Sequence, residues 1–192
     1  MSGPSTLLDV ILSRRSLSPK RLMHPAPSPG QLKTIVQASA AAPDHKKLRP
    51  FRFILIPDHK RSDLASAFRE AKRARDPSST DDDLDRAASK AHNGPMLLAL
   101  VVRTIRDDPR VSVLDQHICA GAAVENLLLA AHSLGFGGCL RSGTSATSRT
   151  VREALHLDGS EDLAAFVILG TPQKPHGPPR DDEFASLLTT WD

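Results

Sequence analysis

Several residue types that often reveal a function are scarce in this sequence. The chain of 192 residues has two cysteines, Cys119 and Cys139, no tyrosine and one tryptophan, and aromatic residues make up only 4% of it. Two cysteines outside a C-x-x-C pair are too few for a disulfide framework or a zinc site. The shortage of aromatic rings, together with an acidic second half, makes a nucleic-acid-binding module the weakest interpretation.

Long hydrophobic runs are also missing. No apolar run reaches the roughly 18 residues that indicate a membrane-spanning helix. The N-terminal apolar run is short and is followed, not preceded, by basic residues, which is the reverse of a signal peptide. Because free cysteines fit a reducing compartment, we expect a soluble cytoplasmic protein.

The composition and the charge distribution favour one domain with an anionic ligand. A chain of this length with 40% hydrophobic residues can bury a core, so we predict a single domain over residues 1–192, with a Pro-rich C-terminal arm from about residue 173. The net charge is +3, but residues 1–60 hold ten Lys or Arg and three Asp or Glu, whereas residues 91–192 carry a net charge of −4. This asymmetry suits an anionic small ligand as well as a polyanion.

Periodicity and capping signals predict a layered domain of helices and strands. Ser5 is a predicted N-cap of the first helix, the pair Ser28-Pro29 starts the second, and Thr80 caps a later one. The predicted helices then cover 61–75, 112–134 and 147–155, and the predicted strands cover 51–56, 96–102, 137–140 and 163–169. The run Met96–Val102 is apolar throughout, as in a strand buried on both faces.

Two basic motifs are candidate ligand contacts. Arg14-Arg15-Ser16 follows the first helix and offers two guanidinium groups and a hydroxyl, which can grip a phosphate. Basic residues in a last helical turn also serve simply to complement the helix dipole. In Pro43-Asp44-His45-Lys46, a histidine and a lysine stand side by side in a loop before a strand. They can contact an anion or a ring, although a solvated basic loop is the ordinary alternative.

A glycine-rich segment, GFGGCLRSG at 135–143, is the third candidate. Its glycines allow a backbone to approach a flat ligand closely, and Arg141 and Ser142 add side chains that can bind phosphate. A helix C-cap explains Gly135 but not the whole run. The sequence has no GxGxxG after a first strand, no GxxxxGK[ST] and no histidine spacing typical of a metal site.

Taken together, these motifs resemble the nitroreductase family of flavoproteins, and within it a subgroup of small NAD(P)H nitroreductases. The matching features are Arg14-Arg15-Ser16, then Ala42 to Lys46, then the long helix leading into 135–143, and finally Leu169 to Gln173. Their order and spacing match over nearly the whole chain. The resemblance implies an α+β fold with a central mixed sheet flanked by helices, in an interlocked homodimer with FMN at the subunit interface.

The resemblance also implies the site residues and the reaction. Carried over by position, the FMN-binding residues are Arg14, Arg15, Ser16, His45, Lys46, Leu140, Arg141 and Ser142, with His45 reaching the flavin from the partner subunit. The NAD(P)H donor would lie near Ala130, Ala131, His132, Ser133, Leu134 and Gly135. No protein side chain is expected to be catalytic and no metal is expected, because the flavin carries the chemistry at N5. Arg15 would stabilise the reduced flavin if it lies at the N1/O2 edge.

The expected function is that of an FMN-dependent NAD(P)H oxidoreductase that reduces nitroaromatic or quinone-like acceptors by a ping-pong mechanism. Leu140 stands where many members of the subgroup have tryptophan, and Ala41 where an arginine often helps to bind the phosphate. Two extra residues also lie between Ser16 and Pro25. The alternatives are a flavin carrier or sensor without turnover, and a flavin-degrading or dehalogenating relative on the same fold.

Overall fold

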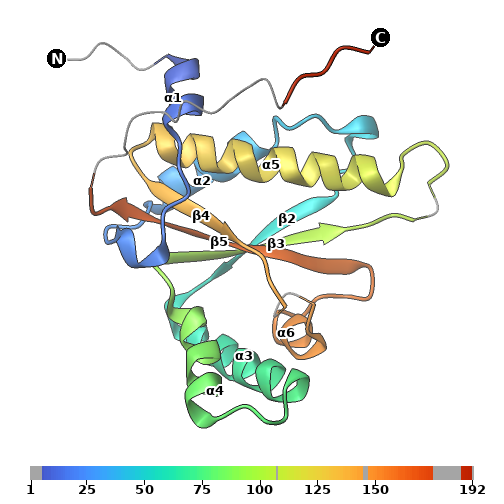
Figure 1. Ribbon diagram of the computed structural model, residues 1–192. Helices are drawn as coiled ribbons and strands as arrows, with labels where there is room; N and C mark the ends of the chain where they lie inside the picture. The colour runs from blue at the N-terminus through green and yellow to red at the C-terminus, as the bar shows by residue number, and fades with distance from the viewer. Residues whose placement is uncertain (1–5, 107, 145–146, 175–186, 192) are drawn as a thin grey trace.

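A five-stranded sheet forms the centre of the computed structural model, which describes residues 6–106, 108–144, 147–174 and 187–191 (Figure 1). The strands are β1 (Leu22–Met23), β2 (Phe51–Ile56), β3 (Met96–Arg103), β4 (Gly137–Arg141) and β5 (Glu161–Pro172). The long β5 pairs with β1, β3 and β4, and β2 pairs with β3. All of these ladders are antiparallel.

Helices cover both faces of this sheet, which gives an α+β fold. They are α1 (Leu7–Ser13), α2 (Pro29–Ser39), α3 (Arg61–Arg75), α4 (Asp81–Ala88), α5 (Val113–Ser133) and α6 (Arg149–Ala154). Short 3₁₀ turns follow the same order: η1 (Pro19–Arg21), η2 (His45–Lys47), η3 (Asp58–Lys60) and η4 (Ser89–His92). Figure 1 shows α2 and α5 on one face of the sheet and α3, α4 and α6 on the other.

The helices begin and end close to the predicted residues. Ser28 caps α2 in a capping box, with Pro29 in the first turn, and Thr80 caps α4 in the same way. Gly135 has φ +85°, which an L side chain adopts only with strain, and it follows the end of α5 as predicted. The first helix is capped by Thr6, one residue later than expected.

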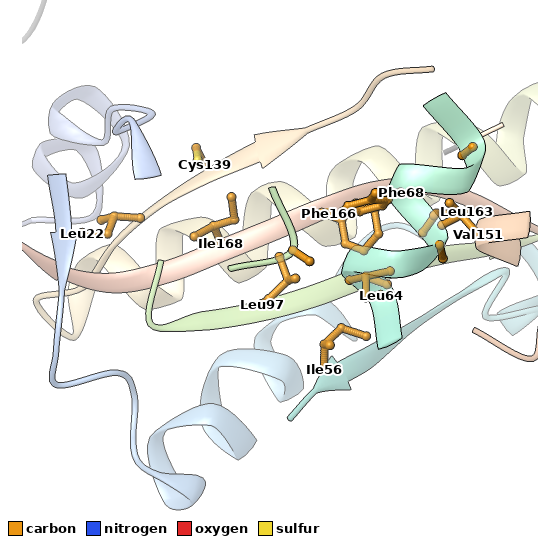
Figure 2. Close-up of a cluster of buried hydrophobic side chains, with 14 residues drawn as sticks. Leu22, Ile56, Leu64, Phe68, Leu97, Cys139, Val151, Leu163, Phe166 and Ile168 are labelled. Carbon is orange, nitrogen blue, oxygen red and sulfur yellow. The ribbon is translucent and has the colours of Figure 1, made fainter. Parts of the chain in front are cut away.

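Strand β3 separates two hydrophobic cores because successive side chains point to opposite faces. Leu97 belongs to the core beneath α3, which Figure 2 shows with Phe68, Phe166 and Ile168. Leu98 belongs to the core beneath α2 and α5. The prediction of a strand buried on both faces is therefore confirmed.

The sheet differs from the expected one in three respects. The expected mixed sheet is antiparallel in its ladders, and the one parallel pairing among the described residues is a bridge between Ser16 and Gly138. The two-residue β1 was not expected, and β5 extends beyond the predicted 163–169 at both ends.

No helix in the described part of the chain is long and apolar enough to cross a membrane. Most of the predicted Pro-rich arm, residues 175–186, lies outside the described residues.

Candidate functional site

Two of the predicted motifs meet where the segment after α1 runs beside β4. Ser16 forms a parallel bridge with Gly138, and the backbone N–H of Leu17 donates to the carbonyl of Gly138 at 3.1 Å. Because the pairing is parallel, the following residues continue toward the end of β4. There Ser18 and Arg141 line the same pocket. The fold thus brings together residues that are far apart in the sequence.

Arg14, at the end of α1, has a guanidinium group that the protein only partly satisfies. Its Nε lies 2.8 Å from Oε1 of Glu125 on α5, and its side chain is 23% exposed. Its Nη1 is buried and has no hydrogen-bond partner among the described residues. Arg14 lines a shallow pocket with Arg15, His132 and Gly138, and this pocket has no room for a water molecule. The unused donor of Arg14 therefore lies just beneath the surface, and an anionic group can reach it only if the side chains around it move.

The neighbouring Arg15 is held differently. Its Nη1 donates to the carbonyls of Leu12 and Arg14, both at 2.8 Å. Ser13 Oγ lies 2.8 Å from Nε2 of His132, and this contact joins the end of α1 to the end of α5. The segment predicted to contact NAD(P)H, residues 130–135, therefore lies beside the first basic motif.

The glycines of the third motif have a packing role. A Cβ at Gly137 would lie 2.6 Å from a methyl group of Leu17, and a Cβ at Gly138 would lie 3.0 Å from the carbonyl oxygen of Ile168. These two residues are glycine because neighbouring chain segments approach closely. Close packing explains this pair without a ligand, and because both also line the pocket beside Arg14, their contact with a flat ligand stays a prediction. Gly135 and Gly143, at the two ends of the motif, have open space around their Cβ positions.

The larger pocket, of about 440 Å³, lies on the α3 face of the sheet where β4 ends. Arg141 and Ser142 line it, as the sequence predicted for a ligand, and two lysines that the sequence analysis missed, Lys20 and Lys90, line it as well. Lys20 falls in the stretch with two extra residues, which is the one signal in the sequence. Lys90 ends a run of mixed charge, residues 69–90, whose composition is typical of a solvated helical face. Leu140, just before Arg141, is 41% exposed.

The cysteine inside β4 has a packing role. Cys139 is a free thiol, 3% exposed, in the core beneath α3. Burial raises the pKa of this thiol, and the hydrogen bond and charge of Arg141 oppose the shift. A raised pKa keeps the sulfur protonated and unreactive near neutral pH.

The second basic motif lies elsewhere in the same chain. The carboxylate of Asp44 accepts hydrogen bonds from the backbone N–H groups of Leu48 and Arg49, at 3.1 and 2.8 Å, and so holds a tight loop. His45 and Lys46 are exposed on this loop, and Lys46 has φ +63°. Neither of the two pockets that contain the other motifs is lined by His45 or Lys46. A single copy of the chain does not assemble all the predicted residues.

Comparison with known proteins identifies the family of this chain. The family model described as "Nitroreductase family" matches residues 11–171. The chain is 34% identical over 166 residues to "Putative NAD(P)H nitroreductase YdjA" of Escherichia coli strain K12, covering 86% of this chain and 88% of that protein. A nitroreductase-like protein from Bacillus cereus superimposes with a TM-score of 0.79 at 18% identity, covering 100% of this chain and 99% of that one.

A second solved structure is similar both in sequence and in fold. It is described as a "putative nitroreductase in complex with fmn" from Desulfovibrio desulfuricans. It has a TM-score of 0.72 and 25% identity, and the match covers 100% of this chain and 99% of that one. Because the family model covers most of the chain and the Escherichia coli protein matches it over a similar span, this chain belongs to the nitroreductase family.

Proposed function

We propose that this protein is a cytoplasmic, FMN-dependent NAD(P)H oxidoreductase that reduces nitroaromatic or quinone-like acceptors by a ping-pong mechanism. The observation that carries the proposal is the parallel bridge between Ser16 and Gly138, with the backbone bond from Leu17 to Gly138 beside it. This pairing forms an edge, with Arg14 and Arg15 just before the bridge on one segment and Arg141 and Ser142 just after it on the other. Such an edge suits an elongated ligand with a phosphate at one end and a planar ring at the other.

The residues at this edge fit FMN. Arg14 has a buried Nη1 without a partner in the described part of the chain, which a phosphate oxygen would satisfy. Ser16 is exposed next to it, and its hydroxyl can donate to the phosphate or the ribityl chain. Arg141 and Ser142 would bind the ring, with the half-exposed Leu140 beside it. FMN, when bound, supplies hydride transfer between NAD(P)H and the acceptor.

The chain's own part in the reaction is to bind and position. Residues 130–135 at the end of α5 would contact the NAD(P)H donor, and they lie beside the first basic motif through the Ser13–His132 contact. The nicotinamide itself would have to reach the flavin ring near Arg141 and Ser142 for hydride transfer. Neutralisation of the phosphate by Arg14 would fix the cofactor. Bound water would supply the proton to the acceptor, so no acidic side chain is required at the site.

A second copy of the chain would complete the site. Helix α1 buries none of its residues, and Leu7 and Leu8 are 73% and 66% exposed. On α5, Leu114 and Ile118 are 66% and 58% exposed. Apolar side chains at this density on two helices favour burial against another protomer. In the proposed homodimer, His45 and Lys46 would be supplied to each flavin by the partner, since the fold keeps them away from it within one chain.

The test is an absorption spectrum of the purified, desalted protein, reconstituted with FMN and recorded before and after anaerobic addition of NADPH. We expect bound flavin whose absorbance bleaches, and turnover when nitrobenzene or menadione is added. FMN that binds but does not bleach would instead support the carrier or sensor alternative. A protein that does not bind FMN would contradict the proposal.

The dimer is tested separately by sedimentation. We expect twice the mass of 20.7 kDa. Two matched variants place a glutamate on an exposed helix surface: Leu8→Glu on α1 and Lys33→Glu on α2. We expect Leu8→Glu to sediment as a monomer and Lys33→Glu to remain a dimer. A monomeric wild-type protein would contradict the shared site.

A further inference from the structure

The pocket of about 440 Å³ has an apolar floor with two aromatic rings. Phe68 of α3 and Phe166 of β5 meet edge to face, with ring centroids 5.5 Å apart and an interplanar angle of 90°. Leu97 and Ile168 extend this floor and are each 1% exposed (Figure 2). A volume of this size lies within the usual range for small-molecule pockets, about 300–1,000 Å³.

The rim of the same pocket is cationic. Lys20, Lys90 and Arg141 line it, and none of its lining residues is acidic. The ion pairs found among residues 6–106, 108–144, 147–174 and 187–191 involve neither Lys20 nor Lys90. Exposed lysines are ordinarily only solvated. Three cations without a carboxylate around one apolar hollow instead leave an excess of positive charge that an anionic ligand would neutralise.

Both lysines are carried on turns that the rest of the fold holds in place. Gln173, just after β5, donates its side-chain N–H to the carbonyl of Lys20 at 3.1 Å and its backbone N–H to the carbonyl of Arg21 at 3.0 Å. Lys90 lies in η4, and Arg61 holds the turn that follows η4 by donating to the carbonyls of Gly94 and Pro95. Held turns limit the entropy lost when a ligand binds.

We propose that this pocket is a subsite for a planar ring that carries negative charge, with Lys20 and Lys90 as its counter-ions. The inference rests on the proposed function and deepens it, because the pocket shares Arg141 and Ser142 with the proposed flavin edge. Two rings have this chemistry. One is an aromatic acceptor with a carboxylate, and the other is the reduced flavin, whose charge lies near N1. Arg15 is less suited to either, because it is bonded to its own backbone and lines the other pocket.

The experiment compares the double variant Lys20→Gln/Lys90→Gln with the control Lys33→Gln, an exposed lysine on α2, on the opposite face of the sheet. Calorimetry measures the dissociation constants of 4-nitrobenzoate and of the neutral 4-nitrobenzyl alcohol, with and without FMN. Redox titration measures the midpoint potential of the bound flavin. If the acceptor is the ring, the double variant should bind 4-nitrobenzoate about tenfold more weakly, with little change for the alcohol.

If the reduced flavin is the ring, the result differs. The double variant should lose about tenfold in its preference for reduced over oxidised FMN, which lowers the potential by about 30 mV, and should bind 4-nitrobenzoate as the control does. The inference is overturned if neither quantity departs from the control. The nitrobenzoate titration needs no flavin, so a protein that fails to bind FMN refutes the proposed function separately.

Discussion

Arg14 and Arg61 are both arginines at helix ends with largely buried side chains, but the protein treats them differently. Arg61, the first residue of α3, is 6% exposed, and both of its Nη atoms donate to backbone carbonyls, those of Gly94 at 2.8 Å and Pro95 at 3.1 Å. Arg14 is 23% exposed, is held through Nε by Glu125, and keeps a buried Nη1 without a partner in the described ranges.

The difference separates a structural arginine from a binding one. Burial lowers the pKa of Arg61, and the charge of Asp58 opposes the shift. The protein tolerates this desolvated cation because both Nη groups donate to backbone carbonyls; its Nε, like the Nε of Arg14, has an ion-pair partner but no hydrogen bond among the described residues. At Arg14 the hydrogen bonds are incomplete, which is costly in a protein without ligand and useful in one that binds an anion.

The largest expected effect is the loss of stability on Arg61→Met. Because a buried arginine and two part-buried carbonyls would lose their hydrogen bonds, we expect the free energy of unfolding of the flavin-free protein to fall by about 3 kcal/mol, measured by urea denaturation. Lys60→Met, at the exposed neighbouring residue, is the control and should change it by less than about 0.5 kcal/mol. A similar small change for both variants would mean that the carbonyls find water instead.

Arg14→Met should show the opposite pattern. We expect the dissociation constant for FMN to rise about thirtyfold, the effect of losing a charged hydrogen bond of about 2 kcal/mol. The stability of the flavin-free protein should change by less than about 1 kcal/mol, because Glu125 is half exposed and regains water. Flavin fluorescence measures the first quantity, with Arg73→Met, an exposed change on α3, as control. If Arg14→Met instead lowers the stability and leaves the FMN affinity unchanged, Arg14 is a structural residue like Arg61 and does not bind the cofactor.

Gly138→Ala tests whether the edge itself positions the site. The new methyl group would lie 2.7 Å from Leu169 and 3.0 Å from the carbonyl oxygen of Ile168, so we expect a loss of about 2 kcal/mol in the free energy of unfolding. FMN affinity should fall as well, because Gly138 carries the bridge to Ser16. Gly121→Ala, on α5 with nothing within 4 Å of its Cβ position, is the matched control and should not destabilise the isolated protomer.

The local elements were predictable because their signals are local. The Ser28-Pro29 start, the Thr80 cap and the glycine after α5 each act on the backbone within one turn. The short β1 carries no such signal, because two residues show no periodicity, and it exists only by pairing with the end of β5. Similarly, the bridge between Ser16 and Gly138 depends on contacts across most of the chain.

The site was predictable only in part for the same reason. The arginines and serines of the motifs are visible as patterns, and the fold brings two of the three motifs together. The partners that define their roles are not visible: Glu125 beside Arg14, and Lys20 and Lys90 around the pocket. Each comes from a separate element, and Lys90 sits in a mixed-charge run whose composition indicates only a solvated helix. Tertiary packing, not local pattern, decides which of many surface cations face a common hollow.

The smallest expected change in stability concerns a third arginine, Arg52, which donates its hydrogen bonds to a carboxylate. Arg52 Nε and Nη2 donate to Glu161 at 2.6 and 2.9 Å, and these bonds hold the pKa of Glu161 below its usual 4.5. A lowered pKa in the folded state means that the pair contributes its stability above about pH 4.5 and loses it as the pH falls through the folded value. We expect Glu161→Gln to lower the free energy of unfolding by about 1 kcal/mol near pH 7, with the difference from wild type shrinking in acid. Glu153→Gln, whose partner Arg149 is 91% exposed, should show no such difference at any pH. If Glu161→Gln remains less stable than wild type by the same amount in acid, the Glu161 carboxyl stabilises the fold through packing and hydrogen bonds alone. The charge of the pair with Arg52 would then contribute nothing to stability.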